Sequence, residues 1–125
     1  MSIASTNADF NYADLPVATY SAGENVLVAG SSTGRLLFLK DGVVEVVRQG
    51  TQIAIVDKPG AVFGEISALL NTPHTADVYA LKPSQFYVAN ADLLGYDGSA
   101  LFYVATVLAE RLDRANETLV AALRQ

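Results

Sequence analysis

The sequence predicts a mainly β fold with flanking helices, a small antiparallel barrel or sandwich followed by one long helix. Residues 17–90 contain short runs of Val, Ile, Leu, Phe and Tyr between glycine-containing turns. Closely spaced strands have this pattern, whereas βαβ units do not. Residues 99–125 contain neither Gly nor Pro and are rich in Ala, Leu, Glu and Arg, which favours a helix. A chain of 125 residues is the size of one domain.

The two regions before this helix differ in character. Residues 1–16 are polar and mixed, and we interpret them as an arm or a short helix. Residues 17–98 form the β-rich domain. Its apolar runs predict strands, in the order Asn25–Val28, Leu36–Leu39, Val43–Val47, Gln52–Val56, Ala76–Leu81 and Gln85–Asn90.

Two segments of the β-rich domain carry a more specific local prediction. Asp41-Gly42 lies between two β-type runs. Both residues tolerate positive φ, so the pair predicts a hairpin between Leu36–Leu39 and Val43–Val47. The run Glu65–Asn71 lacks alternation and precedes Pro73, so it predicts one or two turns of helix.

The last region, residues 99–125, has a clear apolar period. Ser99 is a suitable N-cap, and Asp97 lies near the positive end of the helix. The apolar positions alternate in spacing between four and three residues and form a heptad seam. We call this set the seam: Leu101, Ala105, Leu108, Leu112, Ala115, Leu119 and Ala122. It suits packing on the β core of the same chain or pairing with a second copy. Val104, Val107 and Leu123 widen the apolar face, so the helix could also do both.

The composition excludes several kinds of function. The chain has no cysteine and one histidine, which excludes disulfides, iron–sulfur clusters, thiol catalysis and multi-histidine metal sites. We predict no cofactor and no metal. A net charge of −5 does not suit direct nucleic-acid binding. The longest nearly apolar stretch, Ala100–Ala109, is far shorter than the roughly 18–20 residues of a membrane helix. No signal-peptide pattern is present at the start, so we expect no membrane partner and a cytoplasmic location.

One motif matches the nucleophile motif of hydrolases, but the residues around it do not fit that fold. Gly30-Ser31-Ser32-Thr33-Gly34 fits G-x-S-x-G, but the run after it is β-type and the chain is too short for an α/β-hydrolase. No Walker-A lysine and no G-x-G-x-x-G occur. His74 has no identifiable serine partner. We therefore predict that the chain is not an enzyme.

The segment Pro59–Val78, PGAVFGEISALLNTPHTADV, has the features of an anion-binding site, and we call it the cassette. Gly60 and Gly64 allow backbone conformations closed to other residues. Gly64 opens the proposed short helix, so the amides from Gly64 to Ser67 are left unpaired and can bind phosphate. Glu65 beside a phosphate suits a ligand that also carries a hydroxyl donor, such as a ribose 2′-OH.

The cassette resembles the phosphate-binding cassette of cyclic nucleotide-binding domains, as in protein kinase A regulatory subunits and the catabolite activator protein. The family pattern runs F-G-E, an apolar stretch, then P-R-[ST/A]-A-x-V. Here the matching residues are Phe63-Gly64-Glu65, then Pro73-His74-Thr75-Ala76 and Val78. The resemblance continues from near Val17 to the end of the chain. It implies an antiparallel β-roll of about eight strands over residues 17–98, with a lid and dimerisation helix over residues 99–125.

The resemblance also implies a ligand, cyclic AMP or cyclic GMP, and a role for each cassette residue. Glu65 would accept a hydrogen bond from the ribose 2′-OH, and Thr75 would contact the phosphate or the base. The full implied set is Gly64, Glu65, Ile66, Ser67, His74, Thr75 and Ala76, with Gly64, Ile66 and Ser67 acting through their amides. His74 replaces the family's phosphate-binding arginine, and a histidine lacks arginine's permanent charge and planar fork of donors. This exchange is expected to weaken binding by roughly ten- to a hundred-fold.

These features together predict a sensory or regulatory module in which ligand entry at the cassette is coupled to movement of helix 99–125. We expect a homodimer through that helix. Two alternatives remain open: a dimerisation or scaffold module with an empty pocket, and a sensor of another small ligand. The chain is expected to be either a free-standing sensor or part of a longer regulator.

Overall fold

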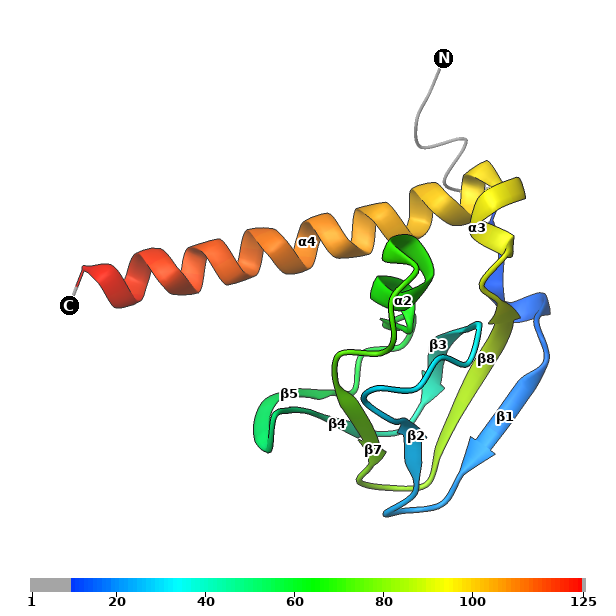
Figure 1. The fold of residues 1–125 in the computed structure, drawn as a ribbon, viewed down its shortest axis with the longest axis horizontal. Coiled ribbons are helices and arrows are strands. Elements are labelled where there is room, and N and C mark those ends of the chain that lie inside the picture. The colour runs from blue at the N-terminus through cyan, green and yellow to red at the C-terminus, as the bar shows by residue number, and fades with distance from the viewer. Residues whose placement is uncertain (1–9, 125) are drawn as a thin grey trace.

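The fold contains eight antiparallel strands in two four-stranded sheets (Figure 1). It is a computed structural model and describes residues 10–124. The first sheet has the order β1 (Val17–Tyr20), β8 (Ser84–Asn90), β3 (Arg35–Asp41) and β6 (Val62–Phe63). The second has the order β2 (Asn25–Leu27), β7 (Asp77–Ala80), β4 (Val44–Arg48) and β5 (Thr51–Val56). The predicted mainly β architecture of about eight strands is therefore confirmed.

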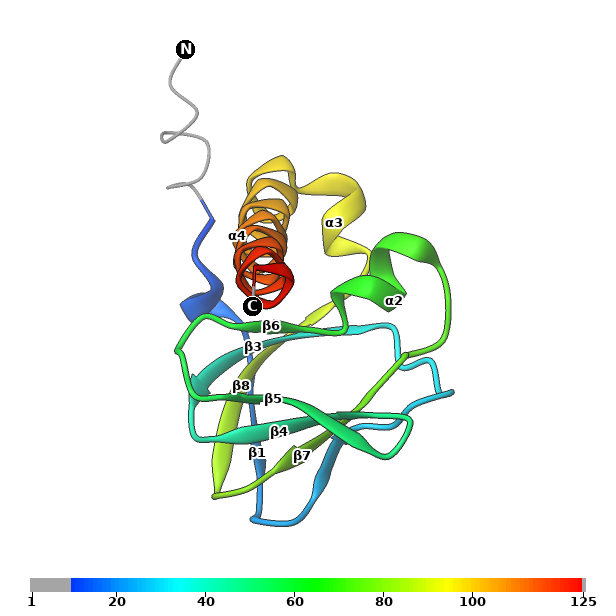
Figure 2. The ribbon, with the colours of Figure 1, turned by 90° about the vertical axis from the view of Figure 1, so that its left-hand side faces the viewer.

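Within residues 10–124, four helices accompany the sheets: η1 (Tyr12–Asp14), α2 (Glu65–Leu70), α3 (Leu93–Tyr96) and α4 (Gly98–Leu123). Figure 2 shows α4 and α2 on the side of β3 and β6, with β4, β5 and β7 on the far side. The predicted short helix and the predicted long C-terminal helix are both confirmed. The apolar pattern did not predict β1, β6 or α3, because elements of two to four residues are too short to show a period.

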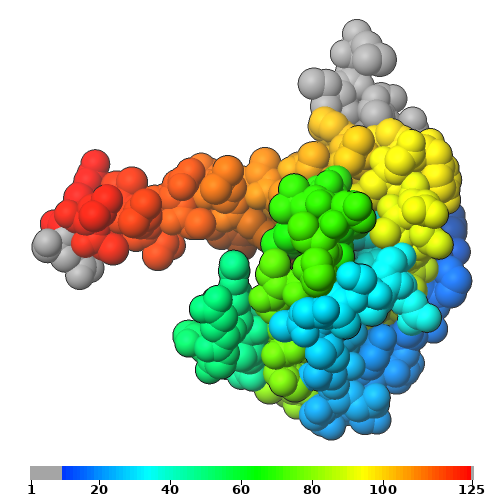
Figure 3. All heavy atoms as spheres, viewed as in Figure 1, coloured from blue at the N-terminus to red at the C-terminus, as the bar shows by residue number. Residues whose placement is uncertain are grey.

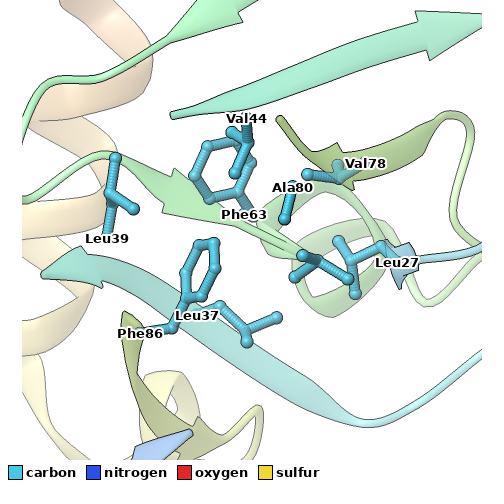
Figure 4. Packing of buried hydrophobic residues seen from close by; sticks show 9 residues of the cluster. Leu27, Leu37, Leu39, Val44, Phe63, Val78, Ala80 and Phe86 are labelled. Carbon is cyan, nitrogen blue, oxygen red and sulfur yellow. The ribbon is translucent and has the colours of Figure 1, made fainter. Parts of the chain in front are cut away.

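Strand β3 divides the apolar interior into two cores. Its run Leu36–Leu39 is fully buried because the strand is covered on both faces. Leu37 and Leu39 face the space between the sheets, where they pack with Phe63 and Phe86 (Figure 4). Leu36 and Phe38 face the other way, under the helices. Successive side chains of a strand point to opposite faces, so this single strand joins the two cores.

The second core fixes the start of α4 on the β-roll. Ala100 and Val104 are completely buried against Leu36 and Phe38. An aromatic group surrounds this contact, and the ring of Tyr12 stacks on that of Phe38 with centroids 5.6 Å apart. The described part of the predicted N-terminal arm thus packs on the domain through η1. Residues 1–9 of that arm lie outside the described residues.

The predicted hairpin at Asp41-Gly42 is wrong. Strand β3 pairs with β8 and β6, and β4 pairs with β7 and β5, so both sides of each strand are already occupied. Gly42, with φ +129°, instead turns the chain from one sheet into the other. The hairpin joins β4 and β5, where Gln49 and Gly50 both have positive φ, as a type I′ turn requires.

The beginning of α4 differs slightly from the prediction, because Asp97 and not Ser99 is its N-cap. The Asp97 carboxylate accepts hydrogen bonds from the Ser99 amide at 3.0 Å, the Ser99 hydroxyl at 2.7 Å and the Ala100 amide at 3.1 Å. A carboxylate in this position satisfies helix amides and lies favourably at the positive end of the helix dipole.

The seam on α4 does not pack on the β core, so that interpretation of it is wrong. The buried positions, Ala100 and Val104, lie one residue away from the first two seam positions. Only Leu108 of the seam contacts the second core. The other six seam residues are exposed: Leu101, Ala105, Leu112, Ala115, Leu119 and Ala122. Leu101 and Ala105 are exposed although they adjoin the buried Ala100 and Val104, because they lie on another face of the helix. The C-terminal part of α4 projects beyond the β-roll (Figure 1).

Replacing Asp97 with alanine is expected to destabilise the domain by about 1 kcal/mol at pH 7. The hydrogen bonds from Ser99 and Ala100 hold the Asp97 pKa below its ordinary value of 3.8. A lowered pKa in the folded state means that the contribution is present above 3.8 and is lost as the pH falls through the lowered value. Urea unfolding at pH 7 and in acid will measure both effects. Asp92→Ala is the matched control, because Asp92 precedes α3 without a side-chain capping bond, and a similar loss there would contradict the capping argument.

Candidate functional site

The cassette folds around a glycine that no other residue can replace without strain. Gly64 has φ +87° and precedes α2 directly. A Cβ at this position would lie 2.5 Å from the carbonyl oxygen of Arg35 on β3. The first amides of a helix have no carbonyl partner inside it, so Gly64 presents the start of α2 with its amides open. Asn71, also at positive φ, ends the helix.

A cavity of about 850 Å³ lies between the cassette, the β4–β5 hairpin and α4. The molecule is visibly hollowed between these segments (Figure 3). All seven predicted binding residues line this cavity: Gly64, Glu65, Ile66, Ser67, His74, Thr75 and Ala76. The structure therefore brings the whole predicted set together on one wall, and their roles toward a ligand stay a prediction.

Glu65 is buried and tied to the long helix. Only 6% of its surface is exposed. The Arg111 guanidinium of α4 donates to Glu65 Oε1 at 2.9 Å and to the carbonyl of Val62 at 2.6 Å. Sequence reasoning missed Arg111, which lies outside the seam and matches no motif. Arg111 therefore links α4 to both the cassette carboxylate and the β6 backbone.

Tyr103 provides a second tie between α4 and the cavity wall. Its hydroxyl donates to the carbonyl of Gly60 at 2.7 Å. Burial, followed by the neighbouring Tyr12, raises the pKa of Tyr103 to about 12. The hydroxyl therefore keeps its proton at neutral pH and remains a donor. A Cβ on Gly60 would lie 2.7 Å from this hydroxyl, so glycine is needed for the contact.

His74 is held firmly in place at the cavity wall. It is 7% exposed, and its backbone pairs with the preceding loop through Gly30 N–H to His74 O and His74 N–H to Ser31 O, both at 2.8 Å. Its Nε2 lies 3.1 Å from the Thr33 hydroxyl. The G-x-S-x-G match found in the sequence is therefore the loop that supports His74.

The permanent positive charges at the cavity come from outside the cassette. The basic side chains that line it are Arg48, Lys58, Arg111 and Arg114, and the acidic ones are Asp57, Glu65 and Glu110. Within residues 10–124, no group of three or more His, Cys, Asp or Glu side chains could hold a metal ion. Among the same residues, no helix combines the length and apolar character needed to cross a membrane.

Comparison with known proteins agrees with this arrangement. The profile of the family described as "Cyclic nucleotide-binding domain" matches residues 17–95. A curated relative, Glutaminase 2 of Bradyrhizobium diazoefficiens, is 42% identical over 65 residues, which are 51% of this chain and 10% of that protein. The chain thus spans about a tenth of the length of this relative.

Two solved structures show the same fold. The catabolite activator protein of Thermus thermophilus has a TM-score of 0.73 and 22% identity, over 97% of this chain and 61% of that one. A structure titled Sp-2Cl-cAMPS bound to PKAR CBD2 has a TM-score of 0.71 and 21% identity, over 97% of this chain and 85% of that one. The match to the family profile extends over more than half of the sequence, from β1 to α3. The chain belongs to the cyclic nucleotide-binding domain family.

Proposed function

We propose that this chain is a sensory module of the cytoplasm that binds cyclic AMP or cyclic GMP in the cavity beside α2. The observation that carries the proposal is the position of Glu65. It is a buried carboxylate at the start of α2, where Arg111 contacts one of its two oxygens and the first helix amides have no carbonyl partner inside the helix. A cyclic nucleotide carries a partner for each of these groups. Its anionic phosphate can accept from the amides, and its 2′-hydroxyl can donate to the carboxylate.

Helix α4 is the element through which binding would be signalled. It forms one wall of the cavity and reaches the cassette through Arg111 and Tyr103. A ligand that contacts Glu65 changes the surroundings of the Arg111 guanidinium directly. Binding moves α4 only if the ligand has different affinities for two positions of the helix. The chain would act by this coupling and not by catalysis.

The direct test is isothermal titration calorimetry of the whole chain with cyclic AMP and cyclic GMP, with guanosine and adenosine as uncharged comparisons. Micromolar binding of either cyclic nucleotide supports the proposal. Binding of the nucleosides alone would favour a sensor of another small ligand. Absence of any binding would contradict a nucleotide sensor.

Glu65→Gln is expected to lower the affinity for a cyclic nucleotide by about tenfold or more, because a hydrogen bond to a charged acceptor contributes ~1.5–3 kcal/mol. Glutamine keeps an oxygen that can accept from Arg111, so the tie to α4 is preserved. The matched ligand is the 2′-deoxy nucleotide. It should bind the wild type and Glu65→Gln with nearly equal affinity, and an equal loss for both ligands would rule out the 2′-hydroxyl contact.

A second function, a dimerisation module, is favoured by the exposed seam. Leu112 is 63% exposed and Leu119 is 56% exposed, and the C-terminal part of α4 projects from the β-roll (Figure 1). The seam alanines allow two such helices to approach closely. In this hypothesis the second copy of the chain covers the seam, and the cavity is empty.

Light scattering is expected to give about twice the monomer mass of 13.2 kDa if the seam pairs two copies. Leu119→Gln should then weaken the dimer more than tenfold, since each buried leucine contributes ~1.5–3 kcal/mol and two are lost. Glu117→Gln places the same amide on the outer side of the helix and serves as the control. A monomer at high concentration would end the dimerisation hypothesis.

A further inference from the structure

The imidazole of His74 has a side-chain hydrogen-bond partner outside the cassette, the hydroxyl of Thr33. Thr33 Oγ1 lies 3.1 Å from His74 Nε2, and the two residues are separated by 41 positions in the sequence. The contact is supported by the paired backbones of the two segments at Gly30 and Ser31. The loop and the cassette therefore present a fixed pair of groups.

The contact distinguishes the two nitrogens of the imidazole. Within the described residues, His74 lines the cavity, whereas Thr33 does not. The nitrogen that meets Thr33 is therefore engaged with a group outside the cavity wall. An imidazole has one further nitrogen, Nδ1, and in the neutral ring one nitrogen donates and the other accepts. If Thr33 donates to Nε2, the proton of the neutral ring is on Nδ1. If Thr33 accepts from Nε2, then Nδ1 is an acceptor.

We propose that Thr33 is a positioning residue, whose hydroxyl donates to Nε2 and so leaves a proton on Nδ1, the nitrogen that serves the ligand. This inference rests on the proposed function, because an N–H at Nδ1 is useful only toward an acceptor such as a phosphate oxygen. A hydroxyl can donate or accept without rearrangement. Thr33 therefore leaves the neutral histidine with an N–H donor at Nδ1.

Nitrogen-15 NMR of the whole chain tests this directly, because the single histidine gives one imidazole spectrum. At pH 8 without ligand, wild type should show a protonated Nδ1 and an unprotonated Nε2. Thr33→Val, which has the same shape without the hydroxyl, should shift Nε2 toward its protonated position. Thr33→Ser restores the hydroxyl and should restore the wild-type spectrum. An unchanged spectrum in Thr33→Val would overturn the proposal.

Binding gives the second measurement. Thr33→Val should weaken binding of whichever cyclic nucleotide the wild type binds about two- to tenfold, the effect of one neutral hydrogen bond, and Thr33→Ser should restore it. In a His74→Arg background the same substitution should have no effect, because no imidazole remains to be oriented. An equal loss in both backgrounds would show a merely structural role and overturn the proposal.

The two measurements separate this proposal from the proposed function. If neither wild type nor His74→Arg binds a cyclic nucleotide, the proposed function fails, and so does the ligand-facing role of Nδ1. The NMR comparison would still decide whether Thr33 sets the proton of His74. If cyclic nucleotides bind and Thr33→Val changes neither spectrum nor affinity, only the positioning role fails.

Discussion

Gly42→Ala is expected to lower the free energy of unfolding by about 2–5 kcal/mol, a large part of the total for a domain of this size. Gly42 has φ +129°, where an L side chain is strained by ~1–2 kcal/mol. A Cβ there would also lie 2.6 Å from the backbone Cα of Ser84. Ser84 is 1% exposed, so it cannot move aside, and overpacking of this kind costs about 1–3 kcal/mol.

Thermal unfolding will measure the effect, with an expected fall in Tm of roughly 10 °C. Gly50→Ala is the matched control, since Gly50 also has positive φ, +78°, but nothing lies within 4 Å of its Cβ position. It should lose only about 1 kcal/mol. In a double-mutant cycle, Gly42→Ala should cost less in a Ser84→Gly background, because the contacts with the Ser84 Cβ and Oγ are removed while the backbone contact remains. Equal losses for Gly42→Ala and Gly50→Ala would contradict the close approach to Ser84.

The same glycine shows where sequence reasoning about the fold reaches its limit. The apolar runs and turn residues were sufficient to predict six of the eight strands, because burial and turn chemistry are local properties. Whether Asp41-Gly42 closes a hairpin or turns a corner depends on which strands occupy the neighbouring positions. That is decided by β8 and β7, which lie some 40 residues further along the chain. The local pattern therefore predicted most of the strands and the two main helices. It could not predict strand pairing, so the expected pairing of β3 with β4 was wrong.

The candidate site divides in the same way. The seven cassette residues lie in one continuous segment with a recognisable order, so they could be named from the sequence. The residues that hold them come from elsewhere. Arg111 reaches Glu65 across 46 positions, Tyr103 reaches Gly60 across 43 and Thr33 reaches His74 across 41. No spacing rule connects such pairs, because the fold alone makes them neighbours.

The burial of α4 gives a further example of this limit. The heptad period correctly predicted a long helix, but two apolar faces overlap on it. The face that packs on the domain carries Ala100 and Val104, and the seam beside it is exposed. A sequence shows that a helix has a wide apolar face. It does not show which part of that face packs on the helix's own domain.

His74→Arg is expected to raise the affinity for a cyclic nucleotide by about ten- to a hundred-fold at pH 7.5. A guanidinium offers a permanent charge and two parallel donors to a phosphate, and a hydrogen bond between charged groups contributes ~1.5–3 kcal/mol. The cavity supplies no such group from the cassette itself, since its arginines come from β4 and α4. The gain should appear in calorimetry with cyclic AMP, cyclic GMP or both.

An uncharged donor at the same position provides the control for this exchange. His74→Gln is the matched variant, because its amide donates a hydrogen bond without carrying a charge. It should bind a cyclic nucleotide more weakly than His74→Arg. Tight binding by wild type without improvement in His74→Arg would mean that the amides before α2 hold the phosphate by themselves. If all three proteins fail to bind, this chain shares the family's fold without its ligand, and the exposed seam of α4 becomes the stronger basis for its function.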